Sequence, residues 1–391
     1  MTDSATPAPI NWVTTILFAT TFAAAVILVP LYGAWVGYST ASWIWFAVFL
    51  VASGISITAG YHRLWSHRAY EAHPTLRMFF MLFGAMSIQN SIYVWAAGHR
   101  PHHRFVDDLD DDPYSIRRGF WFSHIGWMIR RYQSGEPDFK YVKDLERDPI
   151  VMFQHRHYVP LVLAMNIGLP VAVGLLSGDV IGTVLLAGLL RLVINHHVTF
   201  FINSVAHSWG RRPYTDTNSS RDNPILALVT YGEGYHNFHH LFATDYRNGV
   251  RWWQWDPTKW LIRGMSFIGM TSNLRTADPV AIERARLDMQ FKTAHDSVAQ
   301  HAERGDSLAV ELRDLIRREY EAFTATLAEW SAAREKWIEA KREQVAGRLA
   351  EQLERFDLTA YTREIEARLR AQRHRVAQLT LTWSATSAIS R

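Results

Sequence analysis

The sequence predicts an all-α integral membrane protein with four transmembrane helices, a cytoplasmic helical cap and a C-terminal helical extension. Apolar stretches long enough to cross a bilayer predict the membrane part, and histidines clustered at the ends of such stretches predict the cap. After about Thr276 the composition becomes rich in Ala, Glu and Arg, which predicts the extension. We therefore expect a membrane domain over residues 1–275 and a charged amphipathic helical extension over residues 276–391.

The four expected spans are each about 20 or more residues long, the length that a helix needs to cross a bilayer. They cover residues 11–35, 39–59, 158–178 and 180 to about 207. The first three contain no Asp, Glu, Lys or Arg, and the fourth contains only Arg191. Because the fourth is longer than a bilayer requires, its C-terminal end should project into water. A charged residue inside a span is by default a functional candidate.

A fifth apolar stretch, residues 76–96, is interrupted by Gln89 and Asn90. We interpret it as lying in the membrane interface, or as entering the membrane and returning on the same side. The alternative is a fifth spanning helix. A fifth crossing would place the histidines that follow this stretch on the opposite side of the membrane from those that precede it.

The distribution of Lys and Arg predicts the orientation. Ten of these residues fall within residues 98–157 and more follow Arg211, whereas the short connections at residues 36–38 and 177–179 have none. We expect a multi-pass protein of the cell inner membrane, with both termini and the active site in the cytoplasm. The formal net charge is only +4 and the basic residues form no single run, which argues against a nucleic-acid partner.

The chain contains no cysteine, which excludes a disulfide framework, a Cys-ligated iron–sulfur cluster and a thiolate nucleophile. Any redox chemistry must use other ligands or an outside electron donor. The extension should form two to four soluble amphipathic helices. These helices either pack only on themselves or provide a docking surface for a partner or a second copy.

Histidines form three clusters, and a lone histidine lies four residues after Asn203. The second and third clusters have the spacing i, i+3, i+4, which places three imidazoles on one face of a helix. The members of the first are five apart, about 140° on an ideal helix, so they converge only if the helix ends or unwinds near Ser66. Pro101 predicts that the second cluster begins a helix. The histidines are His62 and His67; His99, His102 and His103; His236, His239 and His240; and the lone His207.

Imidazole is a ligand for Zn, Cu, Fe and Ni, and one zinc ion takes four ligands. Nine histidines exceed a single zinc site, whereas two adjacent metals with four or five nitrogens each would use them all. Asn203, one helical turn before His207, could contribute directly or through water. We expect the remaining histidines to pack or pair in ordinary ways, with His196 and His197 the least certain; they are residues 73, 124, 155, 157, 196, 197, 295, 301 and 374.

The histidine clusters stand in longer motifs, HRLWSHR, GHRPHHRF, RRGFWFSHIGW, NSVAHSWG, GEGYHNFHH and QWDPTKW. Over about residues 11–273 these motifs resemble the membrane fatty-acid desaturase family, in its stearoyl-CoA desaturase-like branch and of bacterial type. The resemblance implies two Fe2+ ions per chain, held by the nine histidines and by a water-linked Asn203, with no catalytic residue apart from these ligands. It also implies O2-dependent insertion of a cis double bond, at position 9, into a saturated acyl chain, with O2 leaving as water.

Further residues match the family at the substrate site. Gln89, Trp95 and Thr199 resemble residues that line the bend of the acyl tunnel, with ordinary helix packing as the alternative. Arg130 and Arg131 resemble a basic pair that contacts the CoA nucleotide, and positive charge suits phosphates. Their alternative is a positively charged flank of the membrane helices.

The chain departs from the animal acyl-CoA enzymes at Ala97-Gly98, where those enzymes carry an Arg-Asp pair that helps to hold CoA. The substrate is therefore expected to be acyl-CoA, with acyl-lipid as the alternative. A cytochrome b5-like fusion is also absent from the sequence. We expect the electrons to come from a separate ferredoxin-, rubredoxin- or cytochrome b5-like protein with its reductase, and membrane lipids to surround the spans.

Two other functions are compatible with the sequence. A fatty-acyl hydroxylase on the same scaffold shares the abstraction of hydrogen and differs in whether oxygen is transferred to the chain. A zinc-dependent membrane lipid hydrolase or a lipid-binding receptor belongs to a different class, and it needs only three or four ligands.

Overall fold

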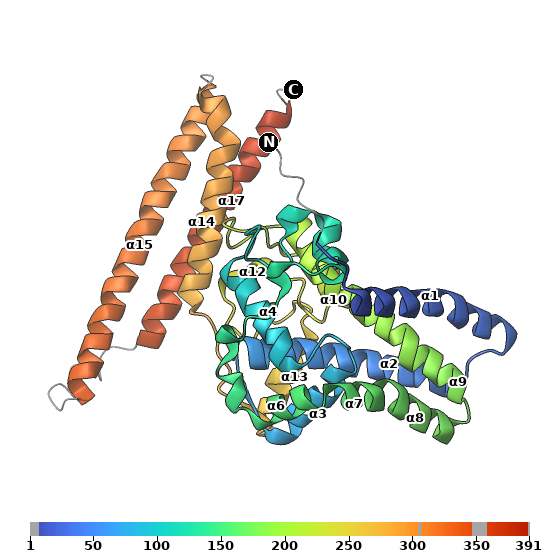
Figure 1. Ribbon diagram of the computed structural model, residues 1–391. Coiled ribbons are helices and arrows are strands. Elements are labelled where there is room, and N and C mark those ends of the chain that lie inside the picture. The colour runs from blue at the N-terminus through green and yellow to red at the C-terminus, as the bar shows by residue number, and fades with distance from the viewer. Residues whose placement is uncertain (1–7, 304–305, 346–357, 390–391) are drawn as a thin grey trace, which may run out of the picture. The chain divides into compact units, whose positions relative to one another are not determined.

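The computed structural model describes residues 8–303, 306–345 and 358–389 (Figure 1). The chain divides into two compact units. The first contains the residues up to Arg211 together with Thr217–Thr276, and the second contains Arg212–Asp216 and the residues from Ala277 onward. Regular structure is helical throughout the described part, apart from two strands of two residues each, so the predicted all-α class is confirmed.

Four helices of the first unit are long and apolar enough to cross a membrane, as predicted. Several contain segments of π-helix, so one span can carry more than one label. The spans are Trp12–Trp35 (α1); Thr40–Ser66, formed by α2 (Thr40–Ile55) and the π-helix η1 (Ser56–Ser66); Tyr158–Ser177, formed by α7 (Tyr158–Leu163), η7 (Ala164–Gly168) and α8 (Leu169–Ser177); and Val180–Ser208, formed by α9 (Val180–Thr183), η8 (Val184–Leu190) and α10 (Arg191–Ser208).

The fifth apolar stretch is not one continuous helix. It forms α3 (Pro74–Ala85) and α4 (Ile92–Arg104), joined by a non-helical connection of residues 86–91. Within this connection the φ angles of Ile88 and Asn90 are 49° and 71°, in the left-handed region that a right-handed helix cannot continue through. The expectation of four spans rather than five therefore holds.

Short helices and a small β-ladder build the cap around the ends of the spans. The strand β1 (Glu71–Ala72) pairs antiparallel with β2 (Thr271–Ser272). This pairing joins the segment that follows the second span to the segment near the end of the first unit. The cap helices are η2 (Ile116–Arg118), η3 (Phe122–Gly126), α5 (Trp127–Ile129), η4 (Gln133–Gly135), η5 (Phe139–Val142), η6 (Leu145–Arg147), α6 (Pro149–Arg156), α11 (Pro224–Val229), α12 (His236–Leu241) and α13 (Pro257–Ser266).

The main core of the first unit lies where η1, α3 and α4 meet. Tyr61, Phe80 and Ile92 are fully buried there. Gly84 allows α3 to approach η1 closely, because a Cβ atom at this position would overlap the ring of Tyr61. This packing holds the end of the second span against α4, and both elements carry predicted metal ligands.

The second unit consists, in its described part, of α14 (Pro279–Glu303), α15 (Ser307–Val345) and α17 (Leu358–Ile389) (Figure 1). Each helix packs against the other two. Leu287, Phe323 and Leu369 contribute one fully buried side chain from each helix to a common apolar core. The number of helices lies within the predicted range of two to four.

Candidate metal centre

The nine histidines of the clusters and His207 lie together in two adjacent groups. Within each group, one nitrogen of every ring lies within 4.8 Å of the corresponding atoms of the others. The rings come from the end of the second span, from α4, from α10 and from α12. The five-histidine group comprises His62, His67, His99, His103 and His239, and the four-histidine group comprises His102, His207, His236 and His240.

A π-helix brings His62 and His67 to one place. Its i→i+5 hydrogen bonds align residues that are five apart, and the backbone N–H of His67 donates to the carbonyl of His62 at 3.0 Å. The two ring centroids are 4.7 Å apart. The expectation that the helix ends or unwinds near Ser66 is confirmed, because the helix ends there and its last turns are the wider turns of a π-helix, which align the two rings.

The helix α4 carries the second cluster on its last two turns. It begins at Ile92, where the Ser91 hydroxyl accepts a hydrogen bond from the Val94 N–H, so the prediction that it begins at Pro101 is wrong. Pro101 instead lies inside the last turn, where it cannot donate the usual hydrogen bond to the carbonyl four residues earlier. Arg100 then fixes this turn to the second span by donating to the backbone carbonyls of Trp65 and Ser66.

The helix α12 carries the third cluster and is short, spanning His236–Leu241. One carboxylate oxygen of Asp222 accepts hydrogen bonds from the N–H groups of Asn237 and Phe238, which stabilises the first turn. Because of its i, i+3, i+4 spacing, this single turn contributes one ring to the five-histidine group and two to the four-histidine group.

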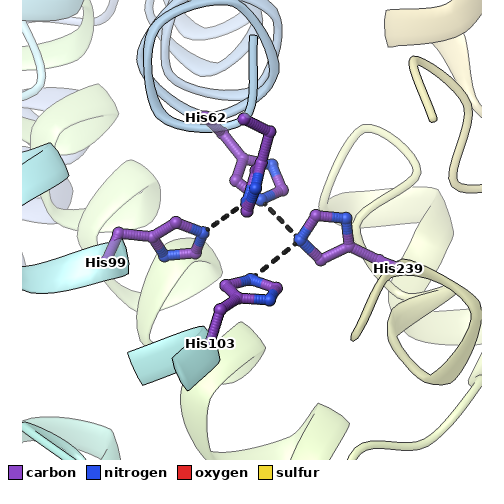
Figure 2. Close-up of side chains that lie close together, drawn as sticks. His62, His99, His103 and His239 are labelled. Carbon is purple, nitrogen blue, oxygen red and sulfur yellow. Dashed lines mark hydrogen bonds between the residues drawn. The ribbon is translucent and has the colours of Figure 1, made fainter. Parts of the chain in front are cut away.

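The Nε2 atoms of the rings point toward one another, as Figure 2 shows for four members of the five-histidine group. The Nε2 atom of His239 lies 2.9 Å from that of His62 and 3.0 Å from that of His103. In the four-histidine group, the Nε2 atom of His236 lies 3.1 Å from that of His207 and 3.0 Å from that of His240. One ring nitrogen cannot donate to two partners at once, so these contacts are not an ordinary hydrogen-bond network.

Several rings are oriented by partners on their outer nitrogen, Nδ1. His62 Nδ1 lies 2.9 Å from a carboxylate oxygen of Glu233, and His102 Nδ1 lies 2.8 Å from Asp112. His207 Nδ1 lies 2.7 Å from the Ser219 hydroxyl. A carboxylate accepts a hydrogen bond from Nδ1–H, and in a neutral ring this leaves the lone pair on Nε2, where it faces inward.

Glu233 belongs to a buried network of charges. Its carboxylate lies 2.9 Å from the guanidinium of Arg63, which also lies 3.1 Å from Asp256. Asn248 donates to the same carboxylate at 2.6 Å. Burial alone would raise the pKa of Glu233, but the charges and hydrogen bonds of His62 and Arg63 outweigh it and lower the pKa to about 2. The carboxylate is thus ionised and able to hold the His62 proton.

Burial also favours the neutral form of six of the clustered rings. Burial and the neighbouring rings, chiefly His102, together lower the pKa of His236 to about 3, although Glu233 opposes them. Burial and the neighbouring histidines lower the pKa values of His67, His99, His103, His239 and His240 well below the usual range. Neutral imidazoles with inward lone pairs are the form that binds a metal ion. The donor set therefore fits a pair of metal ions held by imidazole.

A cavity of about 420 Å³ opens beside the two groups. Histidines of both groups reach its wall, among them His62, His99, His102 and His236. Asn203 also lines it, one turn before His207 on α10. The five residues that were predicted to contact substrate all line the same cavity: Gln89, Trp95, Thr199, Arg130 and Arg131.

The contacts of these residues place them at different parts of the wall. The Gln89 amide donates to the Thr199 hydroxyl at 2.9 Å, and Trp95 stacks on His99 with ring centroids 4.6 Å apart. The Arg130 guanidinium donates to the carbonyl of Ala8 at 2.6 Å. A Cβ atom at Gly98, where the Arg-Asp pair is missing, would meet nothing within 4 Å, so this part of the wall is open.

Some residues of the site were not predicted. Glu233 and Asp112 orient predicted ligands, and carboxylates so close in sequence to the histidine clusters could have been recognised as their partners. Trp127 lines the cavity, and within the described structure its buried indole Nε1 has no hydrogen-bond partner. Its place in the RRGFWFSHIGW motif was a usable signal. His124, by contrast, pairs with His197 outside both groups, as expected.

Residues 40–266 match the family model described as fatty acid desaturase. This chain belongs to the fatty acid desaturase family. It is 46% identical over 246 residues to the probable acyl-CoA desaturase of Schizosaccharomyces pombe and 44% identical over 262 residues to acyl-CoA desaturase 1 of Saccharomyces cerevisiae. It is 40% identical over 249 residues to stearoyl-CoA desaturase 5 of Bos taurus.

These alignments cover 63%, 65% and 62% of this desaturase-family chain, respectively. The chain spans about half the length of the two yeast relatives, at 51% and 50%, and 73% of the bovine one. The relatives support the acyl-CoA and stearoyl-CoA branch of the family. They are yeast and mammalian proteins, so they give no support to the predicted bacterial type.

Proposed function

We propose that this protein is an O2-dependent fatty-acyl desaturase that inserts a cis double bond into a saturated acyl chain. The observation that carries the proposal is the position of two histidine groups, with five and four rings, at the wall of a single cavity. Family membership supports it, as do the names of the relatives. Acyl-CoA is the proposed substrate, acyl-lipid is the alternative, and position 9 of the chain is the proposed site.

In this proposal the five-histidine group holds one Fe2+, and the four-histidine group with Asn203 holds the other. The bound iron pair would activate O2 and oxidise two neighbouring methylene groups. In the balanced reaction, –CH2–CH2–, O2, two electrons and two protons give –CH=CH– and two waters. The protein contributes the ligand rings, two of which are held in place by Glu233 and Asp112, and a cavity that keeps the acyl chain away from bulk water.

The cavity wall would position the substrate, because unreactive C–H bonds need placement more than acid–base assistance. Gln89, Trp95 and Thr199 would bend the acyl chain beside the histidines. Arg130 and Arg131 would attract the phosphates of a CoA head group. The open wall at Gly98 would admit a head group other than CoA equally well.

Further parts of the proposal concern the whole protein. Residues 1–275 would form the catalytic domain and residues 276–391 an extension. The histidine groups would face the cytoplasm from a cell inner membrane. A separate ferredoxin-, rubredoxin- or cytochrome b5-like protein would deliver the electrons.

The test is expression of the full chain in a host that lacks desaturases, followed by mass spectrometry of its fatty acids. We expect monoenoic acids with the double bond at position 9, and two iron ions per purified chain. A hydroxylated product without a monoenoic one would overturn the proposal in favour of a hydroxylase. One zinc ion per chain and no oxidised product would favour a hydrolase or a receptor. Assays of purified protein with acyl-CoA or phospholipid, and with each class of donor, would assign the substrate and the partner.

A further inference from the structure

Arg191 is a fully buried cation at the start of α10, within the fourth apolar span. Its guanidinium donates to the carbonyl of Ala187 in its own span at 3.1 Å, to the carbonyl of Met86 at 2.7 Å and to the side-chain oxygen of Asn166 at 2.6 Å. These three acceptors are neutral. A buried charge in a membrane segment is costly, so its retention points to a role for one of these contacts.

Met86 is the first residue of the connection between α3 and α4. Residues 86–91 form no helix there, and both Ile88 and Asn90 have left-handed φ angles. A backbone in such a conformation persists only where its surroundings fix it. Buried carbonyl groups outside a helix also require donors from elsewhere.

The helix α10 supplies donors to this connection. Arg191 donates to the carbonyl of Met86, and the His196 Nε2 atom lies 2.9 Å from the carbonyl of Ser87. Asn195 donates to the Ser53 hydroxyl at 2.9 Å and makes a long contact of 3.5 Å with the Ser87 hydroxyl. Arg191, Asn195 and His196 thus each contact the connection directly.

The same connection carries a residue of the cavity wall. Gln89 donates to the side chain of Asn195 at 3.2 Å and to that of Thr199 at 2.9 Å. Ile88, Gln89 and Asn90 all line the cavity. The shape of this wall thus depends on how α10 holds the connection.

We propose that Arg191 is a positioning residue for the acyl substrate. Together with Asn195 and His196, Arg191 fixes the conformation of residues 86–91. This conformation sets the position of the Gln89 side chain in the cavity wall. The position of Gln89 in turn determines which methylene group of the acyl chain reaches the metal centre. The inference rests on the proposed desaturase function. A purely structural role is the competing explanation, in which Arg191 only joins the third and fourth spans through Asn166.

The test compares the double-bond positions produced by full-length variants in a desaturase-deficient host. We expect Arg191→Met to move the double bond or to spread it over several positions, with the ratio of products at position 9 to those elsewhere falling about tenfold or more, because small misplacements at a reacting centre have large effects. Arg191→Lys keeps a donor and should restore much of the wild-type ratio. Iron content should stay at the wild-type value in both variants.

Two further variants separate positioning from structure. Asn166→Leu removes the contact with the third span and should leave the product positions unchanged. Gln89→Leu should shift them as Arg191→Met does, and the double variant should show little additional shift, because both changes act on one element. If Arg191→Met lowers only the yield and leaves the positions as in wild type, or if Asn166→Leu shifts them equally, the proposal is overturned.

A second measurement does not depend on activity. The chain has no cysteine, so Ser87→Cys places a single, buried thiol on the connection. We expect a membrane-permeant maleimide to label this thiol faster when Arg191→Met is added, and at an unchanged rate when Asn166→Leu is added. Equal rates in all three backgrounds would overturn the positioning role. If the wild type yields no monoenoic acid, the proposed function fails, and the labelling rates still test the positioning of the connection.

Discussion

The two units of this protein stabilise their interiors in opposite ways. The first buries charged side chains among its apolar ones, and Arg63, Arg191 and Asp256 are each at most 1% exposed. The second unit has an interior made mostly of side chains such as Leu287, Ile365 and Leu369. An apolar core tolerates exchange of similar side chains, whereas a buried charge requires particular partners.

The unit that buries charged side chains is also the unit that contains the candidate metal centre. The residues that match the fatty acid desaturase model, 40–266, belong almost entirely to the first unit, together with both histidine groups. Two buried carboxylates of that unit contact rings of the histidine groups, and its buried Arg191 donates to the carbonyl of Met86. The comparison predicts that substitutions of buried polar residues in the first unit impair the chemistry, whereas core substitutions in the second unit change only stability.

The largest effect is expected for His239→Ala. The Nε2 atom of His239 faces those of both His62 and His103, so its removal opens the centre of the five-histidine group. Monoenoic product should be lost and bound iron reduced while the protein stays in the membrane, as mass spectrometry and metal analysis would show. His102→Ala should abolish activity in the same way. His157→Ala is the control, because this ring is exposed and lies outside both groups. Full activity in His239→Ala would contradict a metal site shared by the histidine groups.

A smaller effect is expected for Glu233→Gln. The change removes the charge that orients His62 and leaves Asp256 as the carboxylate that faces Arg63. Loss of an outer partner of a metal-binding histidine lowers metal affinity by about 10–100-fold. Competition with a chelator would measure the change. Glu71→Gln, at an exposed side chain of strand β1, is the control. An unchanged metal affinity in Glu233→Gln would show that this carboxylate does not support metal binding.

In the second unit, Leu369→Ala should destabilise without changing the chemistry. Leu369 is fully buried, and truncation of such a side chain costs about 2–5 kcal/mol. Thermal unfolding followed by circular dichroism should show an earlier transition, with iron content and product unchanged. Leu381→Ala on the same helix, where the side chain is 67% exposed, should leave the transition in place. Loss of iron in Leu369→Ala would show that the units are coupled.

The smallest effect is expected from truncation after Thr276. All nine clustered histidines and every residue that lines the cavity remain in the shortened chain. Iron content per chain should equal that of the full-length protein. If the truncated protein lost its iron, the extension would be part of the catalytic domain, and the contrast between the units would disappear.

Much of the architecture could be predicted because it depends on local sequence. The length of an apolar run decides whether a helix can span a bilayer, and the i, i+3, i+4 spacing around His99 and His236 decides that three rings share a face. The orientation in the membrane, the domain boundary and the roles of the metal ligands remain predictions. The sequence did not reveal the π-helix that aligns His62 with His67, and it misled us about Pro101.

The sequence by itself determined that nine imidazoles are available, in three clusters and at His207, and that one arginine lies inside a span. Only the tertiary structure decided that the rings divide into groups of five and four, that Glu233 and Asp112 orient two of them, and that Arg191 reaches the carbonyl of Met86. The physical reason is separation along the chain. Glu233 is 170 residues from Arg63, and His239 is 177 residues from His62, so these contacts form only when distant segments pack together.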